Sequence, residues 1–139
     1  MKAVFADTSY WVALLNPKDF LHAEAQKVAT SLGSTPIVTS DLVLVEFLNY
    51  FGATRQFRVA AVTFVDKLRA EKGLVIVPQG REQFEEALTL YRNRPDKSWS
   101  LTDCSSCLLM QGRDIVEVLS SDVNFEQMGF EAVLRGHGQ

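Results

Sequence analysis

The chain has 139 residues, a length typical of one domain with its own hydrophobic core. Its hydrophobic content of 47% and charged content of 22% are ordinary for a soluble globular protein, and its net charge of −3 excludes a generic basic nucleic-acid coat. No apolar run is long enough to cross a bilayer, and Asp7 interrupts the run where a signal peptide would need apolar residues. We therefore expect a cytoplasmic protein that does not enter a membrane.

Short apolar runs alternate with amphipathic segments along the whole chain. In order, the pattern predicts a strand at 2–6, helices at 9–15 and 19–32, a strand at 36–39, a helix capped by Ser40 and ending near 52, a helix at 57–71 and a strand at 74–77. Helices at 81–92 and 101–111, a strand at 115–119, a helical turn at 123–128 and a strand at 131–134 follow. The strands are apolar throughout, which is typical of a parallel sheet covered on both faces. We predict a three-layer α/β/α fold with a mostly parallel sheet in one domain over 1–135, and a frayed tail at 136–139.

Four acidic side chains stand beside or inside apolar segments: Asp7, Glu46, Asp103 and Asp122. Carboxylates are rarely buried unless they are paired or bind something. Ligands of open parallel sheets bind outside the carboxyl ends of the strands, so the four side chains could converge there if their strands are neighbours. Two carboxylates about 4 Å apart repel each other by roughly 4 kcal/mol at the effective dielectric of a protein. A divalent cation such as Mg²⁺ would compensate that charge, and this pattern points to metal-dependent phosphodiester chemistry.

Each carboxylate also has a structural explanation. Asp7 suits the N-cap of the helix that follows it, and Asp122 suits the N-cap of the helical turn at 123–128. Ser100 and Asp103 have the spacing of a capping box. Glu46 is harder to explain in this way, because most of its neighbours at helical spacing are apolar and an unpaired carboxylate there is unfavourable. The four together favour a functional site.

Cys104 and Cys107 have the spacing of a redox or zinc motif. A zinc site needs further ligands, and neither His22 nor His137 stands at a recognisable spacing from the pair. Both cysteines fall inside a predicted helix. We therefore interpret them as small buried residues that fill space in the core.

The acidic motifs resemble those of the PIN-domain ribonucleases and, among them, the VapC-type toxins of toxin–antitoxin pairs. The resemblance spans nearly the whole chain and rests on four segments: Val4-Phe5-Ala6-Asp7-Thr8-Ser9, Ser40 to Phe47 with Glu46, Ser100-Leu101-Thr102-Asp103-Cys104, and Leu119-Ser120-Ser121-Asp122-Val123-Asn124-Phe125. It implies an acidic pocket that binds Mg²⁺ or Mn²⁺ and hydrolyses RNA phosphodiester bonds with an activated water. It also implies a homodimer and a cognate antitoxin that docks near the pocket and silences it.

The resemblance also implies roles for single residues. By motif position, Asp7 and Asp103 would be the main metal ligands. Glu46 and Asp122 would complete the pocket through water or a second ion. Ser9 corresponds to a small hydroxyl residue that commonly supports the first aspartate.

One position departs from the family pattern. Asn124 stands where many relatives carry another Asp or a His, so a site of five carboxylates is not supported. Two alternatives of function stay open: a PIN nuclease of housekeeping RNA maturation, and a catalytically idle PIN module that binds RNA or regulates. A phosphatase with an Asp nucleophile is disfavoured, because that chemistry needs a second Asp where Ser9 stands.

Basic residues offer candidate contacts to RNA phosphates in three groups, which are Arg55 with Arg58, Lys67 with Arg69 and Lys72, and Arg92 with Arg94 and Lys97. Trp99 follows the predicted polar loop at 93–98 and is a candidate for stacking on a base. The RNA target and the identity of the antitoxin do not follow from these patterns.

Overall fold

The computed structural model describes residues 2–135 and contains a five-stranded sheet in the order β3-β2-β1-β4-β5. All neighbouring strands are parallel, which confirms the predicted α/β fold with a parallel sheet. The strands are β1 Val4–Ala6, β2 Ile37–Ser40, β3 Leu74–Val77, β4 Glu117–Leu119 and β5 Glu131–Ala132. All three residues of β1 are buried, as expected for the central strand of a sheet covered on both faces. The predicted tail at 136–139 lies outside the described residues.

Some strands are shorter than the sequence predicts, for reasons of pairing. The strand predicted at 2–6 begins at Val4, which pairs with Ile37 at the start of β2, so the residues before Val4 have no ladder partner. The strand predicted at 115–119 begins at Glu117. Ile115 lies outside both elements, because its N–H donates to the Met110 carbonyl at 2.9 Å and closes the turn that follows the preceding helix.

Residues 2–135 form seven helices: α1 Thr8–Leu15, α2 His22–Leu32, α3 Asp41–Tyr50, α4 Arg55–Ala70, α5 Arg81–Asn93, α6 Leu101–Gly112 and α7 Val123–Gln127. The predicted cap of α3 is confirmed, since the Ser40 hydroxyl accepts from the Val43 N–H at 3.2 Å. Helix α2 begins at His22, three residues later than predicted. The Asp19 carboxylate accepts from the Leu21 N–H at 2.9 Å and closes a turn before the helix. None of the described helices is long and apolar enough to cross a membrane.

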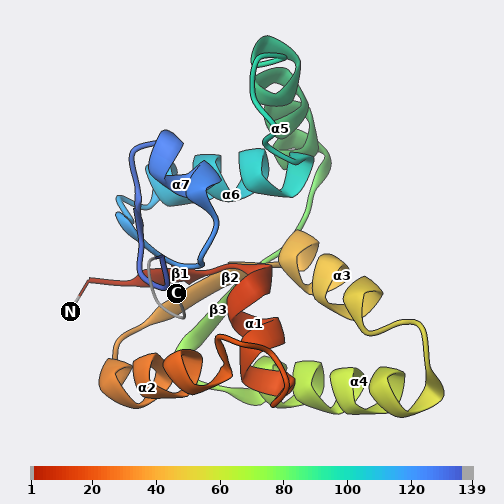
Figure 1. Ribbon diagram of the computed structural model, residues 1–139. Helices are drawn as coiled ribbons and strands as arrows, with labels where there is room; N and C mark the ends of the chain where they lie inside the picture. Colours follow the sequence, from red (N-terminus) through yellow and green to blue (C-terminus); the bar gives the residue numbers. More distant parts are fainter. Residues whose placement is uncertain (1, 136–139) are drawn as a thin grey trace.

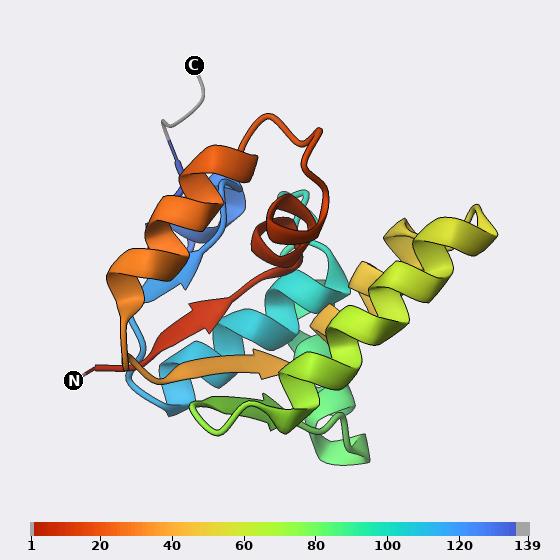
Figure 2. The same cartoon turned by 90° about the horizontal axis from the view of Figure 1, so that it is seen from below.

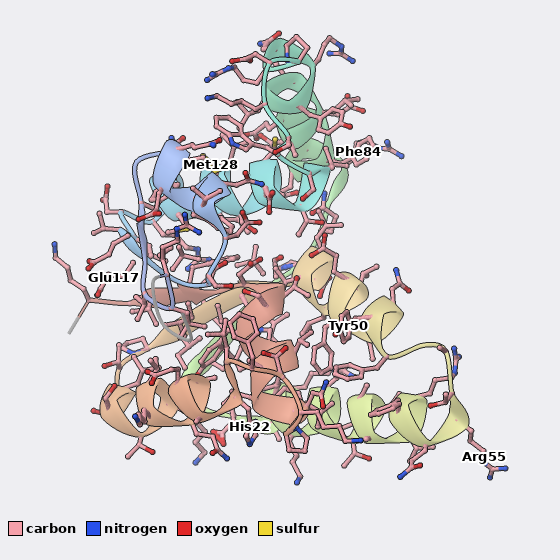
Figure 3. All side chains as sticks on the ribbon, viewed as in Figure 1. His22, Tyr50, Arg55, Phe84, Glu117 and Met128 are labelled. Atoms are coloured by element: carbon pink, nitrogen blue, oxygen red, sulfur yellow. The ribbon has the colours of Figure 1, made fainter. Side chains whose placement is uncertain are left out.

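The helices cover both faces of the sheet. Figure 1 shows α1, α2 and α4 on one side of the sheet and α6 and α7 on the other. The turned view in Figure 2 agrees, with α2 and α4 in front of the strands and α6 behind them. In Figure 3, His22 and Arg55 mark the first layer, whereas Met128 and Phe84 mark the second. Helix α5 packs on α6 rather than on the sheet, with a small core of its own between the two helices.

A buried chain of hydrogen bonds ties α1 to the central strands. The Trp11 indole Nε1 donates to the Thr39 hydroxyl at 3.2 Å, and that hydroxyl donates to the Ala6 carbonyl at 2.8 Å. Thr39 is completely buried. The chain fixes the end of β1 against β2 and α1, and therefore fixes the backbone from which the next residue, Asp7, projects.

Candidate functional site

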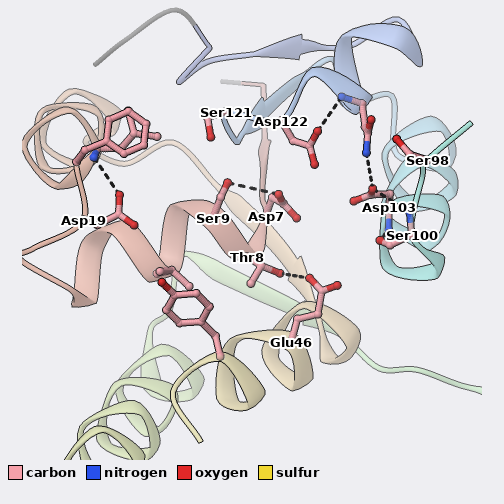
Figure 4. A pocket seen from close by; sticks show the side chains of 15 residues that line it. Asp7, Thr8, Ser9, Asp19, Glu46, Ser98, Ser100, Asp103, Ser121 and Asp122 are labelled. Carbon is pink, nitrogen blue, oxygen red and sulfur yellow. Dashed lines mark hydrogen bonds between the residues drawn. The ribbon is translucent and has the colours of Figure 1, made fainter. Parts of the chain in front are cut away.

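An acidic pocket of about 490 Å³ lies at the carboxyl ends of the parallel strands. The structure brings all six predicted site residues to this pocket, which is lined by Asp7, Ser9, Glu46, Asp103, Asp122 and Asn124 (Figure 4). Their catalytic roles stay predictions. No Lys or Arg is among the described residues that line the pocket.

The register of β1 against β4 explains why distant parts of the chain meet here. Ala6 pairs with Leu119, and the Asp7 N–H donates to the Leu119 carbonyl at 3.2 Å. The sheet order reverses at this pair of strands, since β1 leads outward to β2 and β3 on one side while β4 and β5 follow on the other. A crevice at such a reversal is the usual ligand site of an open α/β sheet.

Asp7 is the most buried carboxylate of the pocket, with 6% of its surface exposed. Its Oδ2 accepts from the Ser120 hydroxyl at 2.9 Å, and the Ser9 hydroxyl lies 3.5 Å from the same oxygen. Loss of hydration on burial raises the pKa of Asp7 from 3.8 to about 7, and the charges of Asp103 and Glu46 add to this rise. Hydrogen bonds from Thr8 and Ser120 oppose it. Asp7 stands at the N-cap of α1, as predicted, but its side chain makes no capping hydrogen bond, so capping does not explain why an aspartate is needed there.

Glu46 lies on α3 and its side chain lines the pocket. The Thr8 hydroxyl donates to its Oε1 at 2.6 Å, which joins the first turn of α1 to the middle of α3. Among the described residues, Oε2 has no hydrogen-bond partner, and in Figure 4 the carboxylate lies at the edge of the pocket. Glu46 is half-buried, so the apolar surroundings predicted for it are only partial.

Asp103 serves both as a helix cap and as a wall of the pocket. The predicted capping box is confirmed, because the Ser100 hydroxyl accepts from the Asp103 N–H at 3.0 Å and Asp103 Oδ2 accepts from the Ser100 N–H at 3.0 Å. The Asn124 amide Nδ2 also donates to Oδ2 at 3.1 Å. Burial raises the pKa of Asp103, and the charges of Asp122 and Glu46 raise it further. The two explanations of Asp103 do not exclude each other.

Asp122 likewise caps a helix while it lines the pocket. Its Oδ1 accepts from the Asn124 N–H at 2.9 Å, which confirms the predicted N-cap of α7. Its own N–H donates to the Ser120 hydroxyl at 3.1 Å. The short turn of α7 thereby places Asn124 so that its side chain reaches Asp103.

Sequence reasoning did not identify Ser120, Asp19, Phe20 or Tyr50 as site residues. Ser120 is completely buried and joins Asp7 to the Asp122 backbone, a role that only the pairing of β1 with β4 reveals. Asp19 lines the pocket from the turn before α2 and adds a fifth carboxylate. Phe20 and Tyr50 line its mouth and are exposed. No local signal in the sequence points to these last three residues.

We expect Ser120→Ala to destabilise the protein by about 1 to 3 kcal/mol near pH 8, because the ionised and buried Asp7 carboxylate loses its hydrogen bond from the Ser120 hydroxyl. The pKa of Asp7 should rise further, since Ser120 now lowers it. Urea denaturation measures the first effect and NMR titration of the carboxyl carbon the second. Ser9→Ala is the matched comparison, and its 3.5 Å contact predicts a smaller effect. Equal effects of the two substitutions would contradict this reading of the contacts.

The donor set of the pocket suits a hard cation, although the side chains are not clustered around one point. Across residues 2–135, no group of three or more His, Cys, Asp or Glu side chains is placed to hold a metal ion. The pocket offers carboxylate oxygens, hydroxyls and an amide, the oxygen ligands that Mg²⁺ prefers. Mg²⁺ commonly binds through one or two carboxylates and keeps several waters, so it does not require three converging side chains.

The two cysteines lie in the interior of the protein. Cys104 and Cys107 are buried and free, and burial raises the pKa of both thiols, that of Cys107 to about 11. They stay protonated at neutral pH and pack as small apolar residues, as predicted.

The prediction for Trp99 is wrong. Its ring is buried at 7% exposure between α5 and α6, where it cannot stack on a base.

Comparisons with known proteins agree with this architecture. The sequence profile of the family described as "PIN domain" matches residues 4–131. The crystal structure of Mycobacterium tuberculosis VapC20, a sarcin-ricin loop cleaving toxin, superposes with a TM-score of 0.84 at 25% sequence identity. The similarity covers 94% of this chain and 98% of that one. A comparison with curated protein sequences gave no match.

Proposed function

The chain belongs to the PIN-domain family, and on that premise we propose that it is a metal-dependent endoribonuclease and the toxin of a type II toxin–antitoxin pair. The similarity to VapC20, which cleaves the sarcin-ricin loop, supports both the reaction and the toxin role. The observation that carries the proposal is the acidic pocket itself. Four carboxylates from separate parts of the chain line one cavity that contains no basic side chain among its described residues: Asp7, Glu46, Asp103 and Asp122.

The residues fit a bound Mg²⁺ or Mn²⁺. Asp7 and Asp103 are our candidates for its direct ligands, and Glu46 and Asp122 would hold it through water or with a second ion. The raised pKa of Asp7 supports this fit, because a buried carboxylate that resists ionisation gains most from a nearby cation. When bound, such an ion stabilises charge on the scissile phosphate and lowers the pKa of a coordinated water.

The surrounding side chains hold these carboxylates in fixed orientations. Ser120 donates to Asp7, Thr8 donates to Glu46, and Asn124 donates to Asp103. Each bond fixes one carboxylate oxygen in place. Such fixed groups favour in-line attack on the phosphate, because little reorganisation is needed when the substrate arrives.

The proposal includes three partners. The substrate is RNA, the inhibitor is a cognate antitoxin that docks near the pocket, and the active form is a homodimer. VapC-type toxins act on RNA and pair with antitoxins, which supports the first two. The main alternative is a PIN nuclease of RNA maturation. Co-purification of the native complex would separate the two, because a toxin should bring with it a small antitoxin and a maturation enzyme should not.

The proposed reaction predicts strict dependence on a divalent cation. Purified protein, freed of antitoxin, should cleave a structured RNA pool with Mg²⁺ or Mn²⁺, and EDTA should abolish cleavage. An excess of Mg²⁺ added after EDTA should restore it and exclude denaturation as the cause. Gel analysis of end-labelled RNA provides the measurement. Cleavage that persists in EDTA, or no cleavage with either metal, would contradict the proposal.

A further inference from the structure

A second cavity, of about 470 Å³, lies next to the acidic pocket. We call it the cationic cavity, because three basic side chains line it and no carboxylate is among its described lining residues: Arg92, Arg94 and Lys97. It is formed by the end of α5, the segment that follows it and the first turn of α6. Trp99 contributes to its wall.

The two cavities are neighbours separated by a single helical turn. They share Ser98 and Ser100 as lining residues, and the consecutive residues Asp103 and Cys104 line one cavity each. Figure 4 shows Ser98 and Ser100 beside Asp103 at one end of the acidic pocket. The two cavities therefore adjoin along the segment that contains these two serines.

Two of the three basic side chains of the cationic cavity, Arg94 and Lys97, lie over the ring of Trp99. The Arg94 guanidinium lies 4.9 Å from the centroid of the Trp99 ring, and the Lys97 Nζ lies 5.8 Å from it. The indole Nε1 of Trp99 donates to Gln127 at 2.9 Å, which fixes the ring. The buried tryptophan is thus a support for cations rather than a platform for a base.

These cations keep donors available for a ligand. Asp96 accepts from Nε and Nη2 of Arg94 at 3.0 and 2.9 Å, and Nη1 is left for another acceptor. Within residues 2–135, neither Arg92 nor Lys97 forms an ion pair with a carboxylate. Asp96 also interacts with the charge of Lys97, which helps to lower the pKa of Asp96, so Arg92 is the cation least offset by a carboxylate. A fixed guanidinium beside two further cations suits the oxygens of a phosphodiester.

We propose that the cationic cavity binds a backbone phosphate of the RNA strand next to the phosphate cleaved in the acidic pocket. This inference rests on the proposed function. The protein carries a net charge of −3, and five carboxylates line the acidic pocket, so the pocket by itself repels an RNA strand. Basic groups directly beside it offset that repulsion and set the path along which the strand crosses the site. Their contacts are to the backbone, so they position the strand without reading its sequence.

The test measures the affinity of a short single-stranded RNA at several salt concentrations. An Asp7→Asn background in EDTA keeps the RNA intact. For single strands the slope of log K against log salt falls by about 0.7 for each phosphate contact that is lost. We expect Arg92→Gln and Lys97→Gln each to lower the slope by about that amount, and Lys97→Arg to preserve it.

Lys2→Gln is the matched control. Lys2 is exposed and precedes β1, so it lies at the amino ends of the strands, whereas the pocket lies at their carboxyl ends, and its removal should leave the slope unchanged. Equal slopes for the parent protein and both glutamine variants would overturn the inference and would point to an acidic protein segment as the occupant. A loss of affinity with an unchanged slope would overturn it too, because that result indicates altered packing.

Cleavage of RNA by the protein with native Asp7 is measured in parallel, so that the two proposals can be separated. Metal-dependent cleavage together with unchanged salt slopes would overturn the cationic cavity alone. Failure to bind RNA at low salt and failure to cleave it would overturn the proposed function and the inference together. The Arg92 side chain is exposed and forms no ion pair within the described chain, so its variant should fold like the parent protein.

Discussion

Asp7→Asn is expected to abolish RNA cleavage while it makes the folded protein more stable at neutral and higher pH. The substitution keeps the shape of the side chain and an oxygen that can accept from Ser120, but it removes the charge that would hold a cation. A metal ion contributes several kcal/mol of transition-state stabilisation. Because every 1.36 kcal/mol corresponds to a tenfold rate, the loss should be about 100-fold or more.

The gain in stability follows from the raised pKa of Asp7. The folded protein holds a proton on this carboxyl up to about pH 7, whereas the unfolded chain releases it near 3.8. Between these values the folded state binds more protons, so the stability of the natural protein falls as the pH rises. At 1.36 kcal/mol per pKa unit, this decrease is at most roughly 4 kcal/mol. The asparagine side chain does not ionise, so the variant should avoid the decrease.

Urea denaturation without metal, near pH 4 and near pH 8, measures this difference. The two proteins should have similar stability at the lower pH and should differ at the higher one, with the variant more stable. Mg²⁺ should then raise the melting temperature of the natural protein and not that of the variant. A folded Asp7→Asn protein with full cleavage activity would rule out Asp7 as a ligand or catalytic group.

Two substitutions of Asp103 should separate its role in the pocket from its role as a helix cap. Asp103→Asn keeps an oxygen at the position of Oδ2, and this oxygen can still accept from both the Ser100 N–H and the Asn124 amide. Stability should therefore change by less than about 1 kcal/mol, while cleavage falls about 100-fold or more. Asp103→Ala should lose cleavage and also about 1 to 3 kcal/mol of stability, because it removes the acceptor of both bonds.

Thr54→Ala is the matched control for the loss of a cap. The Thr54 hydroxyl accepts from the Phe57 N–H at 3.3 Å at the start of α4, and Thr54 does not line the acidic pocket. We expect a similar loss of cap energy with cleavage unchanged. Melting curves and initial cleavage rates of the variants provide the data. If Asp103→Asn cleaves RNA at the natural rate, Asp103 is a structural cap and nothing more.

The sequence predicts the parts of the fold that depend on local pattern. Continuous apolar runs predict buried parallel strands, and Ser40 and Ser100 predict helix starts that the structure contains. The convergence of Asp7, Glu46, Asp103 and Asp122 on one pocket is also expected from sequence, because parallel strands end at the same edge of the sheet.

The errors arise where packing between distant segments decides the outcome. Ser120 does not stand out from Ser121 in the sequence, and only the pairing of β4 with β1 places it on Asp7. Trp99 follows a polar loop and suggests exposure, but α5 folds back onto α6 and covers it. Ile115 has the composition of a strand residue, yet it closes the turn that follows α6. Secondary-structure propensity and hydrophobic periodicity describe local sequence, so they cannot predict these contacts between distant segments.

The central position of β1 determines when the pocket can exist during synthesis of the chain. Asp7 and its closest hydrogen-bond donor, Ser120, are 113 positions apart in the chain. During synthesis, β4 can place Ser120 beside Asp7 only after the whole segment between the two residues has been made. A nascent chain that has not yet reached Ser120 therefore lacks a complete pocket. The site of the proposed nuclease is in this way absent while this segment is being translated.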